Sequence, residues 1–209
     1  MHKLARLRYG LYLITHPVDG FWDLKHAGKG SFKAAMVIML LYFFSTLVRR
    51  QLMSWYFREA YVYFLNVFTE FASQIGPFAL WALACWCITS LLDGEGTMKD
   101  ISKATAYSLV PMIFTNFIVV IISHLLTSRE AMILDLITSI GLIWSLGLVF
   151  MSVVVTHQYT VLKSVVVTIL SLLGMVVMVV LGLLVFFLVQ QLIGFGMEIY
   201  TEVIIRLTE

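Results

Sequence analysis

Residues 164–197 read SVVVTILSLLGMVVMVVLGLLVFFLVQQLIGFGM and contain no Asp, Glu, Lys or Arg. An α-helix rises about 1.5 Å per residue, so about 20 apolar residues cross the roughly 30 Å hydrocarbon core of a bilayer. This stretch is longer than that minimum and carries no charge. It therefore predicts an integral membrane protein.

The composition of the whole chain agrees with this prediction. Of 209 residues, 61% are hydrophobic and 12% are charged, whereas a typical soluble domain has about 25% charged residues. The alternating ten-residue pattern of a membrane β-barrel is absent. We therefore expect an all-α fold, a polytopic transmembrane helix bundle with about five spans and short interfacial helices.

The windows between charged residues define the expected spans. They cover residues 33–49, 71–92, 104–126, 131–156 and 164–191. The first window is short, and a Lys or Arg at the centre of a span costs about 2.5–3.5 kcal/mol. We therefore expect Arg49 and Arg50 to end the first helix, with their stems extending toward the surface.

The distribution of Lys and Arg predicts the orientation. Nine of these residues fall on the side of the N-terminus and five on the other side, an asymmetry that favours a cytoplasmic N-terminus. With an odd number of spans, the C-terminus is expected outside, in a multi-pass protein of the cell membrane. The first group is Lys3, Arg6, Arg8, Lys25, Lys29, Lys33, Lys99, Lys103 and Lys163, and the second is Arg49, Arg50, Arg58, Arg129 and Arg206.

Two segments are expected at the membrane surface rather than across it. Within residues 1–30, Leu4, Leu7, Leu11 and Ile14 recur at spacings of three and four, which predicts a short amphipathic helix on the cytoplasmic face. Residues 51–70 combine many aromatic side chains with charges, which predicts a helix at the outer headgroup level. That helix would act as an anchoring collar or as a lateral docking surface.

A short phrase occurs twice, each time before an expected span on the cytoplasmic side. The pattern is Gly-x-Gly-[Ser/Thr]-x-Lys, in which the glycines allow a tight turn and the hydroxyl residue can cap the following helix. The two copies are either similar helix starts or traces of an internal duplication. Their defining residues are Gly28, Gly30, Ser31 and Lys33 in the first copy, and Gly94, Gly96, Thr97 and Lys99 in the second.

The third expected span contains two further features. Pro111 would remove a backbone hydrogen bond, free the carbonyl of Tyr107 and bend the helix, with Ser108 partly compensating. Asn116 lies near mid-span and is the candidate for a hydrogen bond between helices. Stripes of small residues in the last two spans predict close helix packing. The stripe in the fourth span consists of Gly141, Ser145 and Ser152, and the stripe in the fifth of Ser164, Thr168, Ser171, Gly174, Met178 and Gly182.

No pattern predicts a catalytic, cofactor-binding or metal site. The histidines lack metal-ligand spacing, and Ser145 lacks the setting of a nucleophilic serine. A proton relay or active transporter usually carries ionisable groups near the midplane of the membrane. The sequence assigns none to that depth, which disfavours active transport.

The second glycine phrase, followed by Ala-Tyr-Ser-Leu-Val-Pro at residues 106–111, resembles the signature of the Yip domain family. These are the Ypt/Rab-interacting membrane proteins and their bacterial relatives, and residues 16–23 are similar to the corresponding segment of the bacterial members. The Asp-Leu-Tyr-Gly-Pro motif of eukaryotic members is absent. The resemblance implies a five-span, non-enzymatic membrane scaffold or adaptor, whose partners are the lipid bilayer and other membrane proteins or a second copy.

Two other functions stay open on the sequence alone. A channel or transporter component for small molecules would place Pro111 and Asn116 near the solute path. Lipid scrambling or bilayer shaping would depend on the amphipathic helix at the N-terminus.

Overall fold

The computed structural model describes residues 2–57 and 66–208, and throughout these residues the regular structure is helical, as predicted. Two of the helices are short 3-10 turns. In chain order the elements are α1 (His2–Thr15), α2 (Pro17–His26), α3 (Phe32–Leu52), η1 (Trp55–Phe57), α4 (Val67–Leu91), α5 (Met98–Ser108), α6 (Val110–Ser123), η3 (Ser128–Glu130), α7 (Ala131–His157) and α8 (Val161–Thr208).

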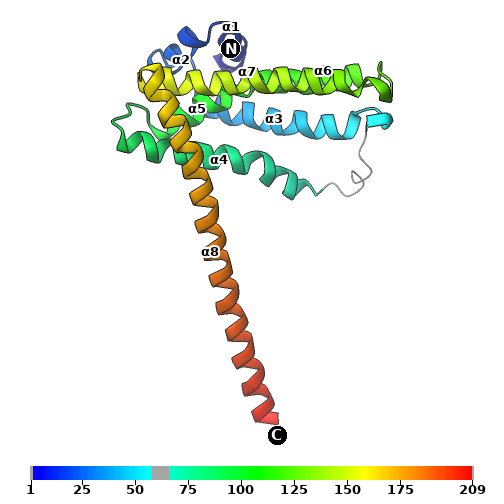
Figure 1. Ribbon diagram of the computed structural model, residues 1–209, viewed down its shortest axis with the longest axis vertical. Helices are drawn as coiled ribbons and strands as arrows, with labels where there is room; N and C mark the ends of the chain where they lie inside the picture. The colour runs from blue at the N-terminus through cyan, green and yellow to red at the C-terminus, as the bar shows by residue number, and fades with distance from the viewer. Residues whose placement is uncertain (1, 58–65, 209) are drawn as a thin grey trace.

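Helices α3, α6 and α7 run side by side, with α4 next to α3 and with α1 and α2 over one end (Figure 1). One apolar core joins α1 and α2 to α3, α5, α6 and α7 around Tyr107, which is fully buried. A second core joins α4, α5 and α7 to the first turns of α8 around Cys85 and Val167. The bundle is therefore most densely packed at the end where α1 and α2 lie.

Five helical segments of the described chain are long and apolar enough to cross a membrane. This agrees with the predicted number of spans. The segments are Phe32–Leu52, Val67–Leu91, Met98–Ser123, Ala131–His157 and Val161–Arg206. The boundaries differ by a few residues for the first four, whereas α8 continues well beyond the expected end at residue 191.

The third span is interrupted where the sequence predicts a bend. Helix α5 ends at Ser108 and α6 begins at Val110, which places Pro111 in the first turn of α6 where its missing N–H is tolerated. The Ser108 hydroxyl donates to the carbonyl of Ala104 at 2.9 Å. The expected compensation of the Tyr107 carbonyl by Ser108 is therefore not what this hydroxyl does.

The helix predicted at the N-terminus forms, and it also packs on the bundle, which the sequence did not predict. Of the residues predicted to face the membrane surface, Ile14 is half-buried against the core. Leu13 is 0% exposed and belongs to the core, whereas Leu11 is 49% exposed. Gly20 of α2 permits this packing, since a Cβ there would lie 3.1 Å from the Cα of Leu13. The side chains of Leu4 and Leu7 lie outside the described residues. Helix docking thus uses Leu13, and Leu11 remains available to a membrane surface.

The predicted packing seams are confirmed where helices meet. Gly141 and Ser145 of α7 are buried, and a Cβ at Gly141 would overlap Thr115 of α6. In α8, Ser164 and Ser171 are fully buried. The predicted seam ends before Gly182, because every residue from 179 to 206 whose exposure is described is exposed. Helix α8 crosses the other helices and extends far beyond them (Figure 1).

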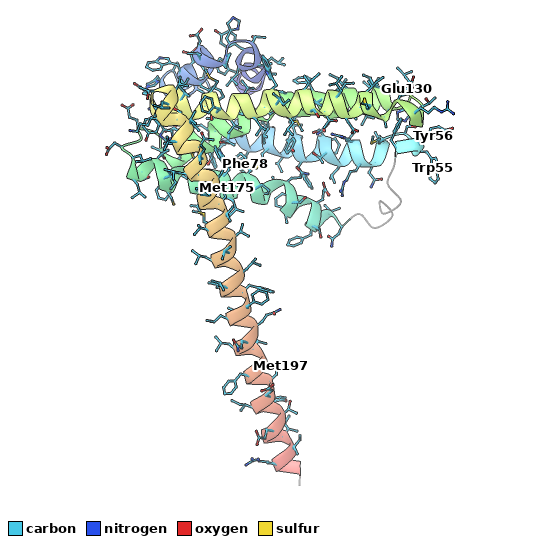
Figure 2. The ribbon with its side chains drawn as sticks, in the orientation of Figure 1. Trp55, Tyr56, Phe78, Glu130, Met175 and Met197 are labelled. Atoms are coloured by element: carbon cyan, nitrogen blue, oxygen red, sulfur yellow. The ribbon has the colours of Figure 1, made fainter. Side chains whose placement is uncertain are left out.

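The aromatic segment after α3 is described only in part. Trp55 and Tyr56 form a 3-10 turn with both side chains more than 70% exposed, at one end of the bundle near Glu130 (Figure 2). Residues 66–70 are the cap and first turn of α4. The remainder of the predicted interfacial helix, residues 58–65, lies outside the described residues.

Candidate functional site

The two glycine phrases form the helix starts that the sequence predicts. The Ser31 hydroxyl accepts a hydrogen bond from the backbone N–H of Ala34 at 3.1 Å, capping α3. The Thr97 hydroxyl accepts from the N–H of Asp100 at 3.3 Å, and the Asp100 carboxylate accepts from the Thr97 N–H in return. Both hydroxyl residues therefore have a structural role at a helix N-terminus.

The glycines of the second phrase lie against the end of α7. A Cβ at Gly94 would lie 2.6 Å from Nδ1 of His157 and 2.7 Å from the hydroxyl oxygen of Tyr159. A Cβ at Gly96 would lie 2.6 Å from Cε1 of His157, and the Gly96 N–H donates to Nδ1 at 3.3 Å. Both positions require glycine because the loop backbone approaches an imidazole that is almost completely buried.

Polar contacts close the same loop from both sides. The Tyr159 hydroxyl donates to the carbonyl of Leu92 at 2.9 Å, and the ammonium group of Lys163 donates to that carbonyl at 2.8 Å. Lys25 of α2 donates to the carbonyl of Thr156 at 2.9 Å. Burial raises the pKa of the Tyr159 phenol, which keeps it a donor. We call this end of the bundle, with residues 92–97, His157 and Tyr159 at its centre, the glycine-turn end.

The first glycine phrase has a different local role. Gly28 adopts a φ of +61°, a conformation that glycine tolerates without strain. The turn lets Lys29 form an ion pair with Asp23 at 2.5 Å, and this hydrogen bond holds the pKa of the Asp23 carboxyl below its usual value. The Tyr9 hydroxyl also donates to Asp23, at 3.2 Å. The pKa of the Tyr9 phenol is raised, mainly by burial and to a smaller extent by the negative charge of Asp23. Lys33 is exposed, as is Lys99 in the second phrase.

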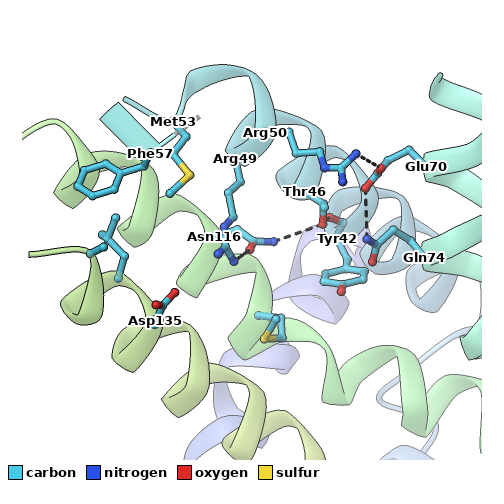
Figure 3. Close-up of a pocket in the computed structure, with 13 residues that line it drawn as sticks. Tyr42, Thr46, Arg49, Arg50, Met53, Phe57, Glu70, Gln74, Asn116 and Asp135 are labelled. Atoms are coloured by element: carbon cyan, nitrogen blue, oxygen red, sulfur yellow. Dashed lines mark hydrogen bonds and ion pairs between the residues drawn. The ribbon is translucent and has the colours of Figure 1, made fainter. Parts of the chain in front are cut away.

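A polar pocket lies at the opposite end of the bundle, between α3, α4, α6 and α7. Its volume is about 500 Å³, within the range of small-molecule sites. Figure 3 shows side chains from all four helices projecting into it. We call it the arginine pocket. It is lined by Tyr42, Thr46, Arg49, Arg50, Met53, Phe57, Glu70, Gln74, Met112, Asn116, Ala131, Leu134 and Asp135.

Asn116 links α6 to α3 at the floor of the arginine pocket. Its amide donates to the hydroxyl of Ser45 at 3.0 Å and to that of Thr46 at 3.4 Å. The predicted hydrogen bond between helices is therefore confirmed. Its carbonyl oxygen accepts from the Arg49 guanidinium at 3.3 Å, and Thr138 of α7 accepts a second bond from Arg49 at 3.2 Å.

Arg49 and Arg50 lie in the last turn of α3, which ends at Leu52, so they end the first helix as predicted. Their side chains, however, do not both extend toward the surface. Arg49 turns inward to Asn116, whereas Arg50 pairs with the largely buried Glu70 of α4 at 2.6 Å. The Arg49 guanidinium thus reaches Asn116, which the sequence places near mid-span. It does so because the long arginine side chain runs back along α3, on the face that carries Ser45 and Thr46.

A model of the Yip1 domain family matches residues 11–184 of this chain. The chain belongs to the Yip1 domain family. The match includes both glycine phrases, Tyr107, Pro111 and the arginine pocket, and it ends within α8. No curated protein and no solved structure matches the chain.

In this Yip1-family chain, the candidate residues named from the sequence lie in two separate places. The second glycine phrase and Tyr107 lie at the glycine-turn end, where Tyr107 is 0% exposed in the core. Asn116 belongs to the arginine pocket instead. Across the described residues no group of three or more His, Cys, Asp and Glu side chains could hold a metal ion.

Sequence reasoning missed His157, Tyr159 and Arg49. The first two contact a loop about 60 positions earlier in the chain, and a single sequence carries no signal for that pairing. Arg49 had a usable signal, since Tyr42, Ser45 and Arg49 recur at spacings of three and four on one face of α3. A polar stripe on an otherwise apolar span indicates a face turned toward other helices.

Proposed function

We propose that this Yip1-family protein is a non-enzymatic membrane scaffold or adaptor that binds other membrane components through α8. The bundle of α1–α7 would anchor the protein, and the projecting part of α8 would contact its partners. The observation that carries this proposal is that every residue of α8 from 179 to 206 whose exposure is described is exposed.

The size of α8 supports the proposal. Its 48 residues correspond to about 72 Å at 1.5 Å per residue, more than twice the thickness of a hydrocarbon core. Tilt and bilayer adaptation accommodate only a modest excess of length. Another membrane protein, or a second copy of this chain, packed alongside α8 would cover the apolar surface that extends beyond the length needed for one span.

Orientation is part of the proposal. Lys25, Lys29, Lys33, Lys99 and Lys163 gather at or near the glycine-turn end, which supports a cytoplasmic location for that end in the cell membrane. The N-terminus would then be cytoplasmic and the C-terminus outside. Reporter fusions at the two termini test this arrangement, and fusions that report the same compartment for both would contradict it.

Photo-crosslinking in intact cells tests the scaffold role. A photoreactive residue replaces Leu184 or Val189 on the exposed part of α8, or Ile143 on the exposed face of α7 as the matched control. We expect discrete protein adducts from the two α8 positions and lipid adducts alone from Ile143. Equal yields of protein adducts at all three positions, or none at the α8 positions, would contradict the proposal.

A channel or transporter component is the second candidate, and the arginine pocket is the observation that favours it. The buried core around Tyr107 and Val110 fills the bundle on the glycine-turn side of Asn116. This packing favours a pocket that ends at Asn116 over a path through the bundle. Thiol labelling of single cysteines at positions 108–122 tests this choice, and reactivity along the whole series would favour the channel.

A further inference from the structure

The arginine pocket contains one cationic and one anionic side chain, Arg49 and Asp135, that form no ion pair with a described residue. Arg49 donates to the neutral oxygens of Asn116 and Thr138 and forms no ion pair with a described carboxylate. A guanidinium has five N–H donors, so donors remain free for a ligand. Asp135 of α7 is exposed in the same pocket, without an ion pair or hydrogen bond to a described residue.

The other charges of the pocket are already satisfied. Arg50 and Glu70 form an ion pair, and Gln74 donates to the second carboxylate oxygen of Glu70 at 3.3 Å. Figure 3 shows this pair on one side of the pocket, with Arg49 and Asp135 projecting from α3 and α7. A ligand that complements the pocket therefore carries an anionic group for Arg49 and a cationic donor for Asp135.

The position of the pocket indicates an amphiphilic ligand. Arg49 is near the end of α3, while Glu70 and Asp135 are near the starts of α4 and α7, so the pocket opens at the end of the spans. The exposed Trp55 and Tyr56 lie at the same end, and such aromatic residues are typical of headgroup depth. Apolar side chains complete its walls, namely Met53, Phe57, Met112 and Leu134.

We propose that the arginine pocket binds the headgroup of an ethanolamine phospholipid. The phosphate accepts hydrogen bonds from the Arg49 guanidinium, and the primary ammonium donates to the Asp135 carboxylate. The apolar wall contacts the glycerol and the first carbons of the acyl chains. This assignment does not rest on the scaffold role, because it concerns α3, α6 and α7 rather than the exposed part of α8.

Related headgroups satisfy only part of the pocket. A phosphocholine group has a quaternary ammonium without an N–H and leaves Asp135 without a hydrogen-bond donor. A phosphoglycerol group has no cation, and its negative charge repels Asp135. Free phosphoethanolamine has the required charges but does not use the apolar wall.

Binding of short-chain lipids to the full-length protein in a neutral detergent tests the proposal. Isothermal titration compares dioctanoyl lipids with ethanolamine, choline and glycerol headgroups, and also soluble phosphoethanolamine. Because hydrogen bonds to charged groups are strong, we expect the ethanolamine lipid to bind about tenfold more tightly than either of the other two lipids. Weaker binding of phosphoethanolamine assigns the ligand to the membrane, whereas equal binding supports the same chemistry with a soluble source.

Two substitutions separate the two charges. Arg49→Gln is expected to weaken binding of all three lipids about tenfold. Asp135→Asn is expected to remove the preference for ethanolamine and to strengthen binding of the glycerol lipid. Asp135 makes no described contact that folding requires, so this variant remains informative if Arg49→Gln fails to fold.

Arg129→Gln is the matched control, since Arg129 is exposed at the same end of the bundle and does not line the pocket. It should leave all affinities unchanged. The proposal is wrong if Asp135→Asn preserves the native order of lipid affinities. It is also wrong if Arg129→Gln weakens binding as much as Arg49→Gln does.

Discussion

The two ends of the bundle contain similar kinds of residues but use them differently. At the glycine-turn end, a loop backbone packs directly on His157 and Tyr159, and lysine side chains donate to the neighbouring carbonyls. At the other end, Arg49 and Asn116 hold the helices together around a hollow of about 500 Å³.

This difference follows from which groups meet at each end. Glycine allows a backbone to approach an aromatic ring within van der Waals contact, so at the glycine-turn end the loop packs directly on the end of α7. Long charged side chains hold helices at a greater distance and leave space between them. The closed end would provide stability and the open end would bind a ligand, and the predictions below test this contrast.

The largest effect is expected at the closed end. Gly94→Val places a side chain where a Cβ alone would lie 2.6 Å from His157 and 2.8 Å from Cβ of Thr89. Overpacking of this kind should lower the free energy of unfolding by about 2–3 kcal/mol. Thermal unfolding in detergent, followed by circular dichroism, measures the loss.

Gly147→Ala is the control for this prediction. Gly147 lies inside α7 at an exposed position, and apart from its chain neighbours and its own helix no atom lies within 4 Å of a built Cβ. The substitution should leave stability unchanged or raise it by about 0.5–1 kcal/mol, because alanine favours the helix. If both variants lost stability equally, tight packing would not distinguish the glycine-turn end from the rest of the bundle.

A smaller loss is expected for the polar link at the open end. Asn116→Ala removes the bonds to Ser45 and Thr46 and takes one acceptor from Arg49. We expect a loss of about 1–2 kcal/mol, since hydrogen bonds between membrane helices are individually modest. Unfolding in a titration with sodium dodecyl sulfate measures it. Phe117→Leu, on the exposed side of the same helix, should change stability little, and an equal loss there would contradict the assignment.

The difference between the two ends also explains how much could be predicted from the sequence. The caps at Ser31 and Thr97 depend on residues within three positions, and both were predicted correctly. The spans follow from apolar windows that are equally local. Asn116 was recognised as a bond between helices because a polar amide inside an apolar span has few alternatives.

The features that were missed depend on distant contacts or on side-chain reach. His157 lies about 60 positions after Gly94 and Gly96 in the chain, and no local pattern encodes their contact. The sequence predicts Arg49 at the surface, because the free-energy cost of inserting an arginine refers to a single helix surrounded by lipid. In the structure, α6 and α7 supply hydrogen-bond acceptors for its guanidinium. The exposed length of α8 was not predicted, because the last span was expected to end at residue 191, where it is already long enough to cross one bilayer.

Tyr159→Phe tests a single contact at the closed end. The substitution keeps the ring, which stacks on His157 and lies 4.2 Å from the Lys163 ammonium, but it removes the hydrogen bond to Leu92. We expect a loss of about 0.5–1.5 kcal/mol in thermal unfolding. Tyr56→Phe, at an exposed position of the open end, should change nothing, and the comparison fails if the two variants behave alike.

The smallest effect concerns the ion pair beside the first glycine turn. Because Lys29 lowers the pKa of Asp23 from 3.8, the folded state favours the carboxylate, and the pair stabilises the protein above about pH 4. This contribution is lost as the pH falls through the lowered pKa. Asp23→Asn should therefore reduce the unfolding temperature slightly at pH 7, and this difference should shrink as the pH falls through the lowered pKa, because the native protein then loses the charge as well. If the difference between the two unfolding temperatures stayed constant from pH 7 to pH 2, the stabilisation would come from packing, as at Gly94, and not from charge.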